Sequence, residues 1–133
     1  MATEGPMIMI PGLTASAALT AKQYYFVKIS GVDTVTVCSA ATDDPIGVLQ
    51  NAPADGAAAE VCAFGITKIS SDAAVTAGNY IGTSGDGQCD PKTYGTDKTE
   101  KIVGKALTTS TTAGGMVTCL INCATPELAV TSA

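Results

Sequence analysis

Two pairs of aspartates are the residues best suited to acid-base or metal chemistry. Asp43 and Asp44 are adjacent and precede Pro45, while Asp86 and Asp90 lie in the glycine-containing stretch "GDGQCD". Paired carboxylates can act as general acid and base, and carboxylate oxygens on a turn can bind calcium. However, adjacent residues of a strand point in different directions, and a calcium loop supplies more oxygen ligands at alternate positions. We therefore interpret the first pair as a strand entry and the second as a hairpin turn.

The cysteines are the other reactive group, and their spacing does not favour a disulfide framework or a zinc site. The chain has five cysteines, an odd number. Cys119 and Cys123 would be half of a zinc site, but no second pair follows their spacing and the chain has no histidine. Most of the cysteines stand among apolar or β-branched neighbours, where a free thiol behaves as a small hydrophobe. We predict buried, free cysteines and folding in a reducing compartment. The five are Cys38, Cys62, Cys89, Cys119 and Cys123.

The composition excludes several classes of function. The seven basic residues are all lysine, and with twelve acids the net charge is -5. Binding of nucleic acid relies on clustered Arg and Lys, so we expect no nucleic-acid partner. Histidine-dependent nucleophilic mechanisms are excluded within one subunit because the chain lacks histidine. We predict a protein that is not an enzyme and that needs neither a cofactor nor a metal.

Short β-prone runs divided by Gly, Pro, Asp and Ser dominate the chain from residue 23 onward. Alternation of apolar and polar residues is clearest in "DTVTVC" and "GMVTCLIN". In "AEVCAFGITKI", we expect Cys62, Phe64 and Ile66 to share one face. This pattern predicts an all-β domain, a small barrel or sandwich, with at most one helical turn near "SDAAVTAG". The predicted strands cover residues 24–29, 33–38, 45–50, 59–69, 79–83, 102–107 and 115–122.

Two stretches of the sequence are organised alike. "IGVLQNAPADGAAAEVCAF" and "VGKALTTSTTAGGMVTCLI" both run from a strand through a glycine-containing loop into a second strand, about 57 residues apart. Each stretch predicts a β-hairpin. Two copies are too few for a solenoid, so the echo is compatible at most with a pseudo-symmetric barrel.

The first 22 residues have neither a helical nor a strand period, and we predict that they form an extended arm before a β-rich domain spanning residues 23–133. Their apolar residues cluster between two prolines, in Met7, Ile8, Met9, Ile10 and Pro11. An exposed apolar cluster would favour aggregation, so it is expected to contact its own domain, a neighbouring copy or a partner. No basic residue precedes this cluster, so we read no secretion signal, and no apolar run is long enough for a membrane helix.

Six short phrases follow one another within residues 23 to 123: "DPIGV", "EVCAFGITKI", "VTAGNYIG", "GDGQ", "VGKAL" and "GGMVTCLI". In their order and spacing, these phrases together resemble the bacteriophage capsid cement, or head decoration, proteins. Asn79 stands where an acid is common in that family, and residues 89–101 insert a polar loop. No phrase of the family matches the first 22 residues.

The resemblance implies a structural virion protein, made in the host cytoplasm, that binds the outer surface of the capsid and stabilises the head. Its implied partners are the major capsid protein and further copies of itself in a homotrimer, with no membrane or nucleic acid. The Met7 to Pro11 cluster is the expected contact with the capsid or a neighbour. A tail or fibre module of a virion is the first alternative. A metal-dependent hydrolase using Asp43, Asp44, Asp86 or Asp90 is the second.

Overall fold

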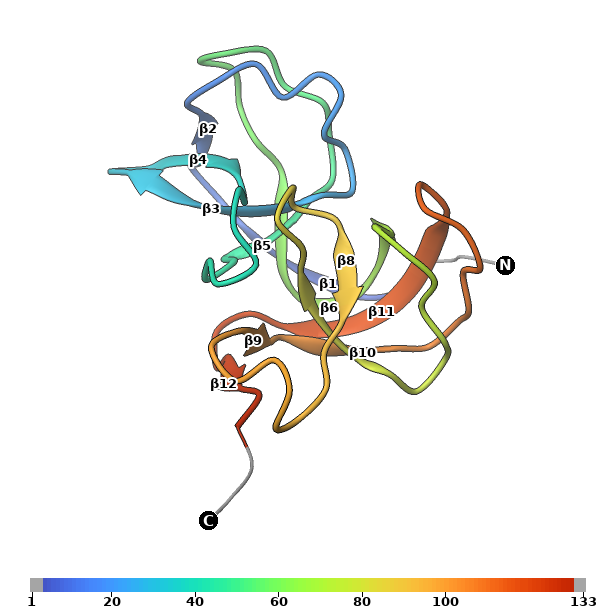
Figure 1. Cartoon of the computed structure of the whole chain (residues 1–133). Helices are drawn as coiled ribbons and strands as arrows, with labels where there is room; N and C mark the ends of the chain where they lie inside the picture. Colours follow the sequence, from blue (N-terminus) through green and yellow to red (C-terminus); the bar gives the residue numbers. More distant parts are fainter. Residues whose placement is uncertain (1–3, 131–133) are drawn as a thin grey trace.

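The computed structural model describes residues 4–130 of the chain, which form an all-β fold, as the sequence predicts (Figure 1). A long, bent sheet has the strand order β2-β4-β3-β5-β6-β11-β10-β7-β8, and β1 pairs with β6 outside this path. A small second sheet consists of β12 and β9. The sheet folds over a core as in a sandwich. The strands are β1 (Met7–Ile10), β2 (Thr14–Ala15), β3 (Phe26–Gly31), β4 (Thr34–Val37), β5 (Gly47–Leu49), β6 (Val61–Ser70), β7 (Tyr80–Thr83), β8 (Cys89–Pro91), β9 (Lys101–Ile102), β10 (Gly104–Ala106), β11 (Met116–Asn122) and β12 (Glu127–Leu128).

Both hairpins expected from the sequence echo are present. β5 pairs antiparallel with β6, and β10 pairs antiparallel with β11. The stretch "SDAAVTAG" contains no helical turn; Val75 instead forms an isolated antiparallel bridge with Ser110. No helix in residues 4–130 is long and apolar enough to cross a membrane.

The internal repeat is larger than the two hairpins: the chain contains the same β unit twice. In the first half, residues 7–63, the strands are arranged β4-β3-β5-β6. In the second half, residues 64–122, they are arranged β8-β7-β10-β11. Each half contains an antiparallel hairpin, β3 with β4 and β7 with β8, whose first strand also pairs with a later strand, β5 in the first half and β10 in the second. The two halves meet in β6, whose first residues close one unit and whose last residues open the other.

Hydrogen bonds between backbone groups repeat at corresponding positions of the two halves. The amide of Gly56 donates to the Ala15 carbonyl at 2.8 Å, and the amide of Gly114 donates to Ser71 at 2.7 Å. Likewise, the amides of Tyr24 and Gly78 donate to Leu49 and Ala106, both at 2.7 Å.

Left-handed backbone conformations also recur in matching places. They occur at Tyr24 and Gly78, with φ of 67° and 94°, and at Asp33 and Gly87, with φ of 56° and 87°. Such conformations are uncommon away from glycine, so their recurrence marks the same local geometry in both units.

The apolar interior is duplicated as well. One cluster of the first half contains Leu19, Val27, Val35, Leu49 and Val61. The corresponding residues of the second half belong to one cluster and are Val75, Ile81, Cys89, Ala106 and Cys119. Because strand side chains alternate between faces, these residues form the inner layer of each unit.

Packing of one half on the other completes the core. Phe26, Val48 and Cys62 point away from the interior of the first half, yet each is 0% exposed, and they belong to the cluster that fills the second half. The amide of Phe26 also donates to the carbonyl oxygen of Gly87 at 2.7 Å, between the halves. Burial of this apolar layer holds the two units together.

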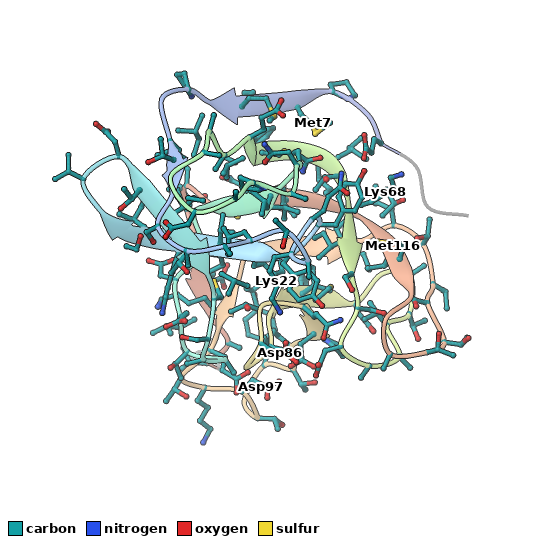
Figure 2. The ribbon with its side chains drawn as sticks, turned by 90° about the horizontal axis from the view of Figure 1, so that it is seen from above. Met7, Lys22, Lys68, Asp86, Asp97 and Met116 are labelled. Atoms are coloured by element: carbon teal, nitrogen blue, oxygen red, sulfur yellow. The ribbon has the colours of Figure 1, made fainter. Side chains whose placement is uncertain are left out.

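The segment before residue 22 is extended, and most of it lies on the sheet. β1 pairs with β6, β2 pairs with β4, and Leu13, Ala15 and Leu19 are buried in the first half. In Figure 2, β1 runs along one outer edge of the molecule, with Met7 on the side that also carries Lys68. The arm is therefore bonded to the domain over residues 7–19; residues 1–3 lie outside the described part of the chain. The division at residue 22 stays a prediction.

Candidate functional site

The five residues expected to contact a partner divide into inward and outward positions. Met7 and Ile10 are partly buried and pack against the two core clusters. Ile8 and Met9 are 63% and 40% exposed, and Pro11 is exposed. The outward part of this cluster is thus free to contact another molecule.

A shallow apolar hollow of about 290 Å³ lies beside β1, lined by Pro6, Met7, Ile8, Phe64, Gly65, Ile66 and Leu120. Its floor depends on a close approach of two backbones at Gly65, which has φ 136°. A Cβ at Gly65 would lie 2.2 Å from the Pro6 carbonyl oxygen, so only glycine lets β1 lie this near to β6. The hollow is apolar, as expected for a protein-binding surface.

A second hollow, of about 380 Å³, adjoins the first and shares Phe64 and Leu120 with it. Its rim is aromatic: the rings of Tyr80 and Tyr94 meet edge to face at 5.3 Å between centroids. The Lys105 ammonium lies 5.1 Å from the centroid of the Tyr80 ring, a cation–π contact. Aromatic residues are enriched at interfaces relative to the rest of a protein surface.

The sequence singled out the apolar residues of β1 but not those of this adjoining surface. Phe64, Tyr80 and Leu120 are 45%, 42% and 45% exposed. Alternation in β6 led to the expectation that Cys62 and Phe64 share a face. The β1 ladder skips Ala63, where its register shifts, so Cys62 is buried while Phe64 is exposed.

Asp43 binds the loop before β5 instead of standing free in water. Its carboxylate accepts hydrogen bonds from the backbone amides of Ser39 and Ala40 at 2.8 and 3.0 Å, and from Lys28 Nζ at 2.8 Å. Burial alone would raise the pKa of Asp43, but these hydrogen bonds outweigh it and hold the pKa below its ordinary value. Asp44 takes no part in this network, so the two carboxylates do not converge on one point.

The aspartates of the "GDGQCD" turn are engaged separately. Asp86 accepts a hydrogen bond from Ser84 Oγ at 2.6 Å, and Asp90 forms an ion pair with Lys92 at 3.2 Å. The fully buried Lys92 ammonium also contacts Glu100. Within residues 4–130, no three Cys, Asp or Glu side chains are grouped so that they could hold a metal ion. The structure gives these acids roles in a turn and a buried ion pair.

All five cysteines are free and buried, as predicted from their apolar surroundings. Cys89 and Cys119 occupy the inner positions that Val35 and Val61 hold in the first half. The hydrogen bond to Cys119, and then burial, raise the pKa of Cys89; burial raises that of Cys38 to about 12. The thiolate, which is the nucleophilic form, is therefore disfavoured.

Comparison with known proteins gives a likeness of fold. The structure is similar to the crystal structure of the head fiber gp8.5 N base in bacteriophage phi29, with a TM-score of 0.63. The match covers 92% of this chain and 99% of that one, at 17% sequence identity. The likeness is one of fold. No protein family model matches the sequence, and no curated protein matches it.

Proposed function

We propose that the protein is a structural component of a phage virion that attaches to the outer surface of the capsid. The observation that carries this proposal is the fold likeness to a phage head fiber base over 92% of the chain. The resemblance of the sequence to head decoration proteins points to the same kind of particle. Since the two lines of argument rest on different features, they support each other.

The surface beside β1 is the part of the molecule best suited to the capsid contact. It combines the exposed side chains of Ile8 and Met9 with the apolar hollow that reaches Phe64 and Leu120. Burial of such side chains stabilises a complex by about 25 cal/mol per Å² of apolar area removed from water. The major capsid protein is the partner that we propose, and a homotrimer is the form in which the resemblance implies it is bound.

Attachment can be tested with purified particles. Expanded heads that lack the protein are mixed with it, pelleted through sucrose and assayed for bound copies. We expect saturable binding with many copies per head, and cryo-electron microscopy should show added density on the outer surface. A protein that stays in the supernatant, or that is found inside the head, would contradict the proposal.

A fibre module is the second candidate, and the named neighbour, a head fiber base, favours it. Copy number separates a head location, which a head fibre would share, from a tail location. Quantitative mass spectrometry of virions should give hundreds of copies for a head-surface protein and a few to tens for a tail component.

A further inference from the structure

The same row of the sheet is covered in one half of the molecule and open in the other. In the first half, Phe26, Val48 and Cys62 lie in register on β3, β5 and β6, and each is 0% exposed. The second half places Tyr80, Lys105 and Leu120 in the corresponding row on β7, β10 and β11. Tyr80 and Leu120 are 42% and 45% exposed, and Lys105 is exposed.

The turn of residues 84–88 in the second half helps to cover the row in the first half. Gly87 accepts the hydrogen bond from the Phe26 amide, and a Cβ at Gly87 would lie 2.6 Å from Val37 Cγ2. At the base of this turn, Thr83 and Ser84 are 1% and 4% exposed.

The corresponding turn of the first half, residues 30–34, covers no such row: its Asp33 carbonyl oxygen accepts a hydrogen bond from the Thr14 amide at 2.9 Å, while its side chains stay largely exposed. Ile29, at the position of Thr83, is 52% exposed, and Asp33, at the position of Gly87, is also exposed. Each half thus has both a turn and a row, but within the molecule only the turn of the second half covers a row, that of the first half.

We propose that the contact between the halves recurs between molecules: Ile29 and Asp33, before and within the turn of residues 30–34 of one copy, cover the Tyr80, Lys105 and Leu120 row of a second copy. The occupant of the open row is then a second copy of this chain, seated as the second half is seated on the first. The inference supplies a surface for the self-association implied by the family resemblance, but it rests on the duplication alone.

The chemistry of the two surfaces is complementary. The turn offers the apolar side chain of Ile29 and the carboxylate of Asp33, and the row offers two apolar side chains around the Lys105 ammonium. An apolar centre with an opposite charge on each side favours association and fixes its register. Since the turn and the row are different surfaces, the interface is head to tail, which produces a ring when the rotation closes.

Sedimentation velocity of the full chain over a range of concentrations tests the inference. We expect concentration-dependent association, weakened about tenfold or more by Ile29→Asp and by Lys105→Glu. Val32→Asp is the matched control, because Val32 corresponds to Asp86, which is exposed at the tip of its turn. That variant should associate like the unchanged protein. Circular dichroism and thermal melting verify that each variant is folded.

Cross-linking identifies the surfaces directly. All native cysteines are buried, so a mixture of Asp33→Cys and Tyr80→Cys proteins presents one new thiol on each partner. We expect disulfide-linked heterodimers to exceed both homodimers, and a mixture of Val32→Cys and Leu107→Cys to give none.

Two results would overturn the inference: a protein that stays monomeric at its solubility limit, and association that neither Ile29→Asp nor Lys105→Glu weakens. Head-pelleting assays on the same variants keep this question apart from the proposed function. If the protein binds to heads as a monomer, the contact between copies is contradicted, whereas the proposed attachment to the capsid is supported.

Discussion

Phe26 and Tyr80 hold the same position in the two halves of the chain, yet Phe26 is fully buried and Tyr80 is 42% exposed. Each pairs across its sheet with the corresponding neighbour, Val48 for Phe26 and Lys105 for Tyr80. The difference therefore comes from what covers the row and not from the backbone. Comparison of corresponding residues in the two halves therefore identifies the surfaces that are covered in one half and exposed in the other.

Asp43→Ala should lower the free energy of unfolding by about 1 to 2 kcal/mol at neutral pH, because it removes the acceptor of three hydrogen bonds. The pKa of Asp43 is lower in the folded state, so its contribution is present above the unfolded pKa of about 3.9 and is lost as pH falls through the folded pKa. Urea unfolding between neutral and acid pH measures this. Asp44→Ala is the control, and a difference between the two variants that did not shrink in acid would contradict the assignment.

Gly65→Ala should destabilise the protein by about 2 to 3 kcal/mol, since the new Cβ would meet the Pro6 carbonyl oxygen and the φ of 136° is unfavourable for alanine. The loss should be largest for the pairing of β1 with β6. Hydrogen exchange would report it as faster exchange of the Ile66 amide, which donates to Pro6. Gly85→Ala serves as the control because a Cβ there meets nothing within 4 Å. Equal stability of the two variants would argue against the close approach.

Ile8→Asp should weaken attachment to expanded heads about tenfold or more, as expected when an anchor of an apolar interface becomes charged. Its effect on folding should be small, roughly 0.5 kcal/mol, because the side chain is 63% exposed. Pelleting assays with labelled protein give the affinity. Leu107→Asp changes a comparably exposed side chain, 47%, outside both hollows, and should bind normally. If the two variants bind alike, the capsid contact lies elsewhere.

Cys89→Val and Cys119→Val should each change stability by less than about 1.5 kcal/mol, because valine fills the corresponding places in the first half. Serine at either position should cost more, about 1 to 3 kcal/mol, since a hydroxyl would be buried among apolar neighbours. Thermal melts of the four variants provide the comparison. In the native protein, a thiol reagent at mildly alkaline pH should label no cysteine before unfolding. Rapid labelling would show that the burial is incomplete.

Seven strands, β3 to β7, β10 and β11, and both hairpins could be predicted from the sequence because alternation and turn residues are local signals. The short strands β1, β2, β9 and β12 could not, because they are held by pairing with distant segments, and neither could β8, which is only 3 residues long. The full duplication could not, because the halves share little sequence beyond "AALTA" and "AAVTA" and differ in loop length. The outer residues of β1 could be singled out from the sequence, since Ile8 and Met9 stand in a visible apolar cluster. The exposure of Phe64 and Tyr80 could not be predicted, because it depends on the register shift at Ala63 and on which half covers the other.

The place of β6 in both halves bears on how the chain folds and how it could be divided. Its first residues pair with β5 and its last residues pair with β11, so a cut within it would leave each fragment most of its own strand pairs but would expose Phe26, Val48 and Cys62. Neither fragment could cover this apolar layer alone, whereas a mixture of the two could reassemble. Despite its two-part plan, the protein should melt in a single cooperative step, and β6 is the segment through which a pulling force on either half would reach the other.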